Sequence, residues 1–396
     1  IEHEKLSTVT YPYEWSFSML KEAAIAVLRI NLIARKYDYQ TKDCHGFNII
    51  FDGAYPKYVD LGSFIKTGEK FRGWLAYEEF LTSYYYPLHI WRKGNSYIAR
   101  RILSDVTLMP HGSYLLYKNP FYRLFSPTFL DKMSNYYHKF RCIYDMSPSE
   151  IRNRVPGFLG DMIVFLKNKR LLPFQAINLS SLLKKVQQIS KKRYFTMWSE
   201  YHNEFYGEGG IISTPRFDRV VDIIKSLKVT SVLDSAGNQG IFSMLLLERT
   251  DIKRIICTDK DENAVDNMYQ TVKSKGIKIA PALFDFVFPI LAPYSKHPSE
   301  RFKSDVIVAL AVTHHLILSS KLYIDYILKT ILIYSNRYIC IEFMPLGLYD
   351  GSRDFGLPVP EWYTIGWFRE HFNRYFITLL EEKLEKNRVL FVGELR

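Results

Sequence analysis

From about residue 195 onward, short runs of apolar residues alternate with longer amphipathic segments. The apolar runs cover residues 231–236, 254–259, 278–286, 305–312 and 337–345, and the amphipathic segments cover 241–249, 262–276 and about 319–332. Nearly continuous apolar strands are typical of a parallel sheet that helices cover on both faces. The alternation therefore predicts a doubly wound, Rossmann-like α/β domain, whose ligands lie beyond the carboxyl ends of its strands.

The first half of the chain has a different pattern. Residues 14–37 predict a helix, and two short strand-like runs at 47–53 and 56–64 are joined by a turn at Asp52-Gly53. Beyond residue 95, the segments 158–172 and 178–192 predict helices with basic outer faces. We therefore predict a mixed α+β fragment over residues 1–95, a helical connecting region over 96–194, and the α/β domain over 195–396.

The composition gives the chain a basic character and restricts its chemistry. Lys and Arg number 53 against 41 Asp and Glu, for a net charge of +12. This charge suits an anionic partner, including the surface of an acidic membrane, but it suits a merely solvated basic surface equally well. No RNA-recognition motif is visible, so nucleic acid is not the expected partner. The four cysteines form no CxxC pair, so neither a metal site nor a disulfide framework is predicted.

Localisation is read from the same features. No charged-then-apolar leader and no run of roughly 18 apolar residues is visible, which favours a reducing, cytoplasmic setting. The sequence begins with Ile1 rather than Met, which leaves room for residues upstream. It says nothing of the oligomeric state.

The segment "VLDSAGNQGIFS" joins the first apolar run to the following helix through a turn of small residues. Asp234 ends the strand, Gly237 lies in the turn and Gly240 opens the helix. Small residues let the backbone approach a ligand closely, and the start of a helix offers free N–H groups. Ala236 and Asn238 stand where such loops usually carry glycine. The turn could therefore be a working cofactor loop, a decayed one, or an ordinary strand-to-helix turn.

Two further acids follow the next two strands. Asp259 ends the second apolar run, where a carboxylate can accept hydrogen bonds from ribose hydroxyls. Asp285 and Phe286 end the third run, a pair suited to the exocyclic amine and the ring of adenine. Three acids at successive strand ends predict a nucleotide-type cofactor, although the G-x-G-x-x-G spacing of dinucleotide sites is absent.

The string D-x-A-G-N-Q-G resembles motif I of class I S-adenosylmethionine-dependent methyltransferases. The blocks "TDKDENAVDNMY", "ALAVTHHLIL", "IEFMP" and "KDCHGFNIIFDGAYPKYVDLGSF" are similar to a bacterial family typified by the nodulation protein NoeA. The resemblance implies S-adenosylmethionine as cofactor, with Asp234 beginning the loop. It assigns the three glycine positions to Ala236, Asn238 and Gly240, the ribose to Asp259, and the adenine to Asp285 and Phe286. It suggests a sugar or glycoconjugate acceptor.

The fourth strand is followed by Thr313, His314 and His315, at the edge where a methyl group would meet its acceptor. If the acceptor is a hydroxyl, His314 is the candidate general base, with His315 as the weaker candidate. The alternative is that these side chains cap a helix or pack against the cofactor. Glu342, after the fifth strand, could orient a substrate or pair with a basic residue.

The N-terminal fragment carries a spacing that resembles protein kinases. Asp43 and Asn48 stand five residues apart, and Asp60 follows Asn48 by twelve in "VDLG". Kinases use one Asp as base and an Asn and a second Asp as magnesium ligands. Only 42 residues precede Asp43 here, too few for a glycine-rich loop and the strand lysine. The fragment is therefore either a kinase-like remnant used for packing or docking, or part of a truncated bifunctional enzyme.

Three functions follow from the sequence. The first is methyl transfer from S-adenosylmethionine to an acceptor, most simply an oxygen of a sugar or another small molecule. The second is a bifunctional kinase–methyltransferase. The third is a basic, non-catalytic binding protein, which rests on charge alone.

Overall fold

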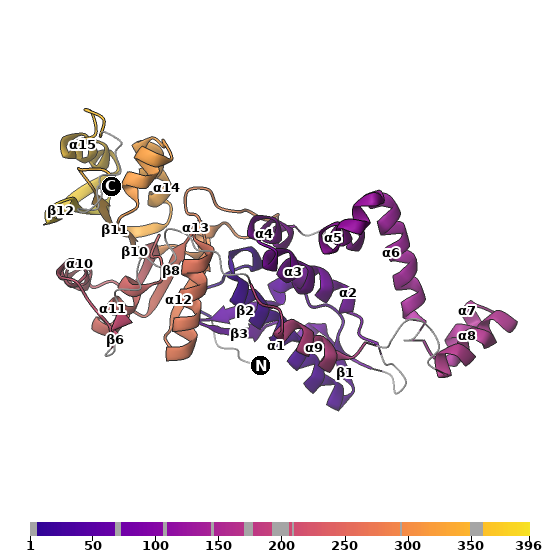
Figure 1. The fold of residues 1–396 in the computed structure, drawn as a ribbon. Helices are drawn as coiled ribbons and strands as arrows, with labels where there is room; N and C mark the ends of the chain where they lie inside the picture. The colour runs from indigo at the N-terminus through magenta and orange to yellow at the C-terminus, as the bar shows by residue number, and fades with distance from the viewer. Residues whose placement is uncertain are drawn as a thin grey trace. The chain divides into compact units, whose positions relative to one another are not determined.

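The computed structural model describes most of the chain, and Figure 1 shows its elements. Described are residues 6–67, 73–105, 109–143, 146–169, 177–191, 206–207, 210–293, 295–348 and 359–396, with only the backbone of 137–142. The chain forms two compact units. Unit 1 holds residues 1–19, 51–55 and 193–396, and unit 2 holds 20–50 and 56–192. The predicted boundary at residue 195 lies close to the start of the long segment of unit 1.

A seven-stranded mixed sheet forms the centre of unit 1, in the order β9-β8-β7-β10-β11-β13-β12. The first five strands in this order run parallel, while β13 is antiparallel to both of its neighbours. The strands are β7 (Ser231–Ser235), β8 (Arg254–Asp259), β9 (Ile279–Leu283), β10 (Ser304–Ala309), β11 (Ser335–Phe343), β12 (Phe376–Glu385) and β13 (Arg388–Leu395). The predicted α/β class is confirmed.

Helices connect the parallel strands, as the sequence pattern predicts. They are α11 (Ile241–Arg249), α12 (Glu262–Lys275), α13 (Pro298–Arg301) and α14 (Ile324–Leu332). Helix α10 (Pro215–Ser226) precedes β7, and α15 (Ile365–Tyr375) lies between β11 and β12. Helix α12 ends where Gly276 takes the left-handed conformation at φ 64°. Helix α14 begins five residues later than predicted, after a π-helical turn at His315–Ser319. A short hairpin, β5 (Tyr206–Gly207) and β6 (Gly210–Ile211), precedes α10.

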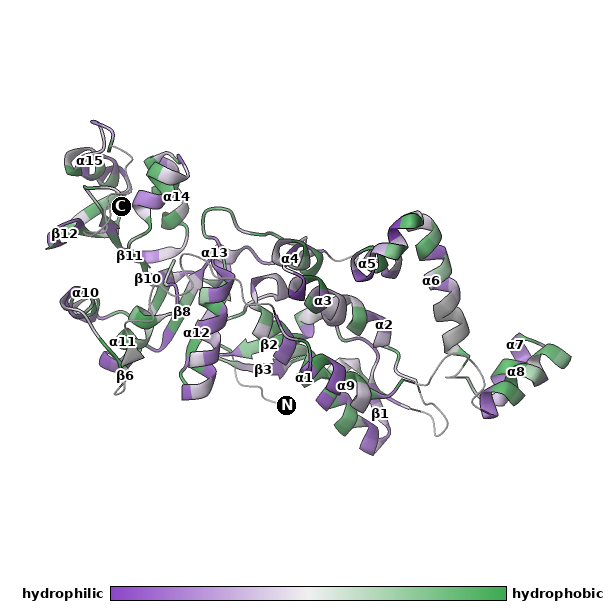
Figure 2. Ribbon diagram, in the orientation of Figure 1, coloured by the Kyte–Doolittle hydropathy of each residue, from purple (hydrophilic) through white to green (hydrophobic). Residues whose placement is uncertain are grey.

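The core of unit 1 comes from the apolar strands and from α14 and α15. Leu233, Ile256, Ile307 and Ile341 are fully buried in one cluster with apolar residues of these two helices, and hydrophobic residues fill much of the central strands (Figure 2). Strand β12, at the edge, instead alternates between more and less exposed residues. The sheet is thus covered on its faces, and its strand ends remain the place for chemistry.

The N-terminal segment also belongs to unit 1. The ring of Trp15 lies 5.1 Å from that of Phe51, and Phe51 lies 6.1 Å from Tyr269 of α12. The Tyr269 hydroxyl donates to the Ala54 carbonyl at 3.1 Å, and Ser18 donates twice to the Asp266 carboxylate. Two chain segments more than 200 residues from α12 in sequence therefore complete its packing.

Unit 2 is mainly helical and holds the small sheet β1-β4, whereas the strands of a second small sheet, β2-β3, include residues assigned to both units. These strands are β1 (Tyr39–Thr41), β2 (Ile49–Asp52), β3 (Tyr55–Tyr58) and β4 (Phe64–Lys66). Its helices are α1 (Phe17–Ala34), α2 (Tyr77–Phe80), α3 (Tyr86–Arg92), α4 (Ser96–Ser104), α5 (His111–Lys118), α6 (Pro127–Cys142), α7 (Pro148–Arg154), α8 (Phe158–Asn168) and α9 (Leu179–Gln187). The three-part division at residues 95 and 194 remains a prediction.

Candidate functional site

The loop between β7 and α11 takes an unusual backbone conformation. Ala236, Asn238 and Gly240 have φ angles of 65°, 52° and 77°. These are the three positions to which the motif resemblance assigns glycine. A left-handed conformation is easy for glycine, tolerable for asparagine and costly for alanine. The loop therefore keeps a glycine-type backbone at two positions that have lost the glycine.

Gly237 is required for a different reason. A Cβ atom at this position would lie 2.5 Å from Cys257 Sγ and 2.6 Å from Asp234 Oδ2. Its N–H donates to the Thr258 carbonyl at 2.9 Å, and the Asn238 N–H donates to Asp259 Oδ2 at 2.9 Å. The turn is thus pressed against the end of β8, and α11 starts immediately after Gly240.

Asp259 connects this loop to the segment after β8. Its Oδ2 accepts from Asn238 N, and its Oδ1 accepts from Asp261 N at 2.8 Å. Asp259 is only 8% exposed, and burial raises the pKa of its carboxyl to about 6. Each carboxylate oxygen has a second lone pair, so the same group can hold the loop and still accept a ligand hydroxyl.

Asp234 is buried at the end of β7 and connects this strand to α11. Its Oδ2 accepts from Ser243 Oγ of α11 at 2.7 Å and lies 3.6 Å from Cys257 Sγ. The residue is 2% exposed, and burial raises its pKa to about 6. Asp234 therefore fixes the distance between β7 and α11, which positions the loop between them.

We expect Asp234→Asn to stabilise the protein above pH 6. The amide oxygen can still accept from Ser243, while the cost of ionising a buried carboxyl is removed. The folded pKa is raised to about 6 from an ordinary value near 4, so native stability falls as pH rises through 6. Urea unfolding should show a gain of about 1–3 kcal/mol at pH 8 that disappears as the pH falls toward 4.

Asp305→Asn is the matched control with the opposite sign. The Asp305 Oδ2 accepts from Thr230 N, Thr230 Oγ1 and Ser231 N, which together lower its pKa. Its replacement should therefore destabilise the protein above pH 4. An Asp234→Asn variant that loses stability at pH 8 would show that the charge of Asp234 is needed.

Of the two residues predicted to bind adenine, Asp285 is partly exposed, whereas Phe286 is buried. The Oδ1 of Asp285 accepts from Val287 N at 2.9 Å and Phe288 N at 3.1 Å. Phe286 is 5% exposed and packs in the core cluster with Phe284 and Phe302. The turn that Asp285 makes directs the Phe286 ring into the core, so the ring itself is a packing group and not a ligand surface.

The segment after β10 brings two histidine rings together. The rings of His314 and His315 are 4.0 Å apart. His314 is 4% exposed, and its Nδ1 has no hydrogen-bond partner in the described part of the chain. Burial lowers the pKa of His314 to about 3 and that of His315 to about 4. Both rings are therefore neutral at pH 7, and His314 is a poor proton acceptor in this state.

Glu342 pairs with basic residues, as one of the two alternatives predicted. It is fully buried at the end of β11, 3.0 Å from Arg388 Nη1 and 3.4 Å from Arg216 Nε. Its Oε2 also accepts from Ala311 N at 2.8 Å, where the backbone has a φ of 51°. Glu342 thus holds the strained segment that leads to His314. Sequence analysis did not identify Arg216, Arg388 or Ala311, because the residues next to Glu342 in the sequence do not show which distant residues it contacts.

Two of the three kinase-like residues, Asp43 and Asn48, are in contact within unit 2. Asn48 Nδ2 donates to Asp43 Oδ1 at 2.9 Å, and Val59 N donates to the Asn48 carbonyl at 2.9 Å. Asp60 lies in the turn that follows, where its Oδ1 accepts from Gly62 N at 3.0 Å. Across the described residues, no group of three or more His, Cys, Asp or Glu is arranged to hold a metal ion. The described helices include none long and apolar enough to cross a membrane.

A curated relative resembles the chain over most of its length. The nodulation protein NoeA of Rhizobium meliloti (strain 1021) is 24% identical in an alignment of 360 positions that covers 87% of this chain and 70% of the relative. The chain is distantly similar to NoeA. The predicted resemblance to the NoeA family is therefore confirmed as a distant one. The aligned region includes part of the N-terminal half of the chain. No protein-family model matches the chain.

Several solved structures related to this fold carry the name methyltransferase. The N-methyltransferase NodS of Bradyrhizobium japonicum WM9 is 13% identical and matches 45% of this chain and 96% of its own, with a TM-score of 0.33. An S-adenosylmethionine-dependent methyltransferase of Clostridium acetobutylicum is 11% identical over 50% of this chain and 96% of its own, with a TM-score of 0.36. One from Aquifex aeolicus is 15% identical over 51% of this chain and 100% of its own, with a TM-score of 0.35.

Proposed function

We propose that the chain transfers a methyl group from S-adenosylmethionine to an oxygen of an acceptor, in the class of sugars and cell-surface glycoconjugates. The observation that carries the proposal is the β7–α11 loop. Its three left-handed residues, 236, 238 and 240, bring the backbone to the end of β8, where Asp259 holds it. This arrangement would let the backbone of the loop approach a ligand closely at the carboxyl edge of a parallel sheet.

The residues at the three strand ends would divide the cofactor between them. The loop from Ala236 to Gly240 would follow the amino-acid part of the molecule, and Asp259 would accept from the ribose hydroxyls. Asp285 would accept from the adenine amine, with Phe286 fixing its turn from the core. S-adenosylmethionine supplies an electrophilic methyl group on a sulfonium. Asp234 would act indirectly, by holding β7 and α11 at a fixed distance.

The acceptor would lie beside the segment after β10. Methyl transfer needs the nucleophile aligned with the sulfonium carbon, so orientation is the main contribution of the protein. The buried Nδ1 of His314 offers one hydrogen bond to an acceptor hydroxyl, and Glu342 holds the backbone of that segment through Ala311. Since burial lowers the pKa of His314 to about 3, its role in this proposal is to orient the hydroxyl. The S–C bond of the sulfonium would break as the O–C bond forms, which would leave S-adenosylhomocysteine, and the hydroxyl proton would pass to solvent.

Binding of S-adenosylhomocysteine tests the cofactor assignment directly. We expect the demethylated product to stabilise the protein by about 2.7 kcal/mol at 100 times its Kd, read as an increase in Tm. Asp259→Ala should abolish the increase, because it removes both the ribose acceptor and the anchor of Asn238. Isothermal titration calorimetry on the same variants gives the loss of affinity independently of Tm.

The exposed Asp251, in the loop after α11, provides the control. Asp251→Asn should keep the full increase in Tm. No increase with either S-adenosylmethionine or S-adenosylhomocysteine would contradict the proposal and favour a non-catalytic basic protein. An increase that survives in Asp259→Ala would contradict the ribose assignment alone. The acceptor class is then tested by transfer of a labelled methyl group to glycans.

A second function, phosphoryl transfer, is favoured by one observation. The 2.9 Å hydrogen bond from Asn48 to Asp43, and that from Val59 N to the Asn48 carbonyl beside Asp60, support this proposal. If this region binds nucleotide, ATP with Mg²⁺ should raise Tm, and Asp60→Ala should remove that effect. An unchanged Tm with ATP and Mg²⁺ would support a remnant used for packing.

A further inference from the structure

Unit 2 carries an exposed row of large apolar side chains on α6 and on the 3₁₀ turn before it, Pro120–Leu124. The rings of Phe121 and Phe125 are 5.6 Å apart, and those of Phe125 and Phe129 are stacked at 5.6 Å. Leu124 is the most exposed member, at 78%. The apolar row consists of Phe121, Leu124, Phe125, Phe129, Met133 and Tyr136.

The geometry of α6 explains why the apolar row faces solvent. Phe129, Met133 and Tyr136 follow one another at spacings of four and three residues, which places them on one face of a helix. Leu130 and Ser134 lie on the opposite side and are buried. Helix α6 is therefore amphipathic in an unusual sense, because apolar side chains occupy its outer face as well.

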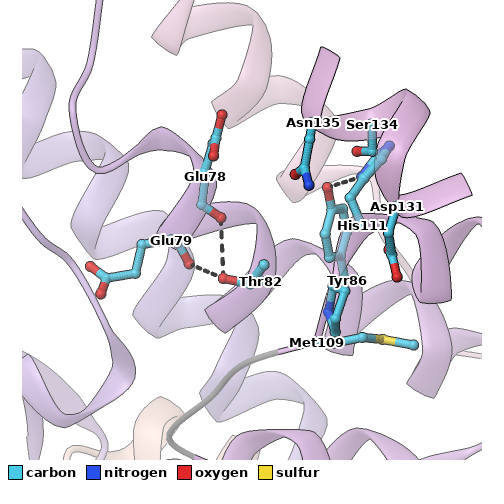
Figure 3. Close-up of a pocket in the computed structure, with 10 residues that line it drawn as sticks. Glu78, Glu79, Thr82, Tyr86, Met109, His111, Asp131, Ser134 and Asn135 are labelled. Atoms are coloured by element: carbon cyan, nitrogen blue, oxygen red, sulfur yellow. Dashed lines mark hydrogen bonds between the residues drawn. The ribbon is translucent and has the colours of Figure 1, made fainter. Parts of the chain in front are cut away.

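The inner face of α6 is already covered by the rest of unit 2. A Cβ atom on Gly112 of α5 would lie 2.5 Å from the backbone nitrogen of Asp131, so the two helices approach each other closely. Figure 3 shows Asp131 and Ser134 on the side of α6 that holds Tyr86 and His111. The apolar row is thus not needed for the packing of α6 against its own unit.

The exposed charges around the apolar row are basic. Lys118, Arg123 and Lys132 are exposed, and Asp131 is the only Asp or Glu between residues 111 and 136. The Oδ1 atom of this carboxylate is buried on the inner face of α6. Lys93 is also exposed, and its Nζ donates to the Lys118 carbonyl at 3.0 Å, which brings a fourth cation to the start of the row. The apolar row therefore lies in a field of positive charge.

Large exposed apolar surface with a polar rim marks an interaction site. Phe and Leu side chains flanked by Lys and Arg are typical of segments that lie in the interface of a membrane. We propose that the apolar row docks unit 2 on the surface of an anionic lipid bilayer. Its side chains enter the boundary between headgroups and acyl chains, while Lys118, Arg123 and Lys132 contact the lipid phosphates.

A second copy of the chain is a poorer match for this surface. Two subunits related by a two-fold axis would place the same patch against itself. The exposed cations of one copy would then meet those of the other, and like charges brought together across an interface cost affinity. An anionic bilayer covers the same apolar side chains and supplies the opposite charge.

Co-sedimentation of the full chain with lipid vesicles tests the proposal. We expect binding to vesicles of phosphatidylcholine that contain about 30% phosphatidylglycerol, and much weaker binding to phosphatidylcholine alone. The bound fraction should fall as salt is raised from about 50 to about 300 mM, because charges at the bilayer surface are screened. Replacing Lys118, Arg123 and Lys132 together by Gln should weaken binding and remove most of this salt dependence.

The double variant Phe121→Ser/Leu124→Ser separates docking from folding. Both side chains are mostly exposed, so Tm should hardly change, while binding to the anionic vesicles weakens by about tenfold or more. Leu75→Ser is the matched control, since Leu75 is an exposed leucine of unit 2 outside the apolar row. This control should bind the vesicles as the parent protein does.

Three results would overturn the proposal. The first is a parent protein that does not bind the anionic vesicles, or that binds vesicles of phosphatidylcholine alone equally well. The second is a double variant that binds the anionic vesicles as tightly as the parent. The third is a parent that forms a dimer in light scattering and a double variant that is a monomer, which would assign the apolar row to a second copy of the chain.

Discussion

Replacing Glu14 by Gln is expected to destabilise the protein by about 3–5 kcal/mol, the cost of leaving a buried charge without its partner. Glu14 is 1% exposed and its carboxylate receives two hydrogen bonds from Arg301, at 2.8 and 2.5 Å. Arg301 Nη1 also donates to the Val9 carbonyl at 2.7 Å, and the guanidinium lies 4.0 Å from the ring centroid of Tyr11. The amide of Gln keeps the shape and removes the charge.

Urea unfolding followed by tryptophan fluorescence measures this effect. The control is Glu370→Gln, which breaks an exposed ion pair of similar length, 2.7 Å to Arg374. Surface pairs of this kind contribute about 0.3–0.5 kcal/mol, so the control should hardly change the free energy of unfolding. Replacing Glu14 and Arg301 together by Met should recover much of the loss, since neither buried charge remains. A loss below about 1 kcal/mol for Glu14→Gln would contradict the desolvation argument.

The second large effect is expected at Gly237. Gly237→Ala should cost about 1–3 kcal/mol, because the added Cβ would lie 2.5 Å from Cys257 Sγ in a buried site. To relieve that contact the loop must move away from β8, which breaks the hydrogen bonds from Gly237 to Thr258 and from Asn238 to Asp259. We therefore expect binding of S-adenosylhomocysteine to weaken by more than tenfold as the loop is displaced.

The neighbouring substitution should have the opposite sign. Ala236 has a φ of 65°, so Ala236→Gly relieves a left-handed alanine at a cost in chain entropy. The net effect is a gain of up to about 1 kcal/mol, with cofactor binding retained. Thermal unfolding and calorimetric titration on both variants test the pair. Destabilisation by Ala236→Gly would show that the alanine methyl makes a contact worth more than the backbone strain.

The sequence anticipated most of the parallel half of the sheet, because both faces of these strands are buried. Continuous apolar runs therefore had to appear at 231–236, 254–259 and 305–312, and the acids near the ends of the first two, Asp234 and Asp259, could be read from the sequence. The C-terminal hairpin of β12 and β13 was not assigned. Its strand β12 alternates apolar and charged residues, "FITLLEEKLE", a pattern that could have predicted a strand with one exposed face.

The site was anticipated less completely than the fold. The three strand-end acids are found at the predicted edge, yet Asp234 turns out to brace Ser243, and Phe286 turns out to be a core residue. The spacing of residues shows which of them reach the edge of a sheet. The spacing does not show which carboxylate lone pairs already accept a hydrogen bond within the protein, because this depends on the rotamer of each side chain and on the residues that pack against it.

By itself, the sequence determined the order of the strands along the chain, the acids at or just after the ends of β7, β8 and β9, and the turn of small residues after β7, since each of these depends on a few adjacent residues. The tertiary structure alone decided the pairing of Glu14 with Arg301, which are 287 residues apart, and that of Glu342 with Arg388. It also decided that His314 is buried and neutral. Local periodicity records which face of an element is apolar, whereas the surface that covers this face is chosen by packing among distant segments.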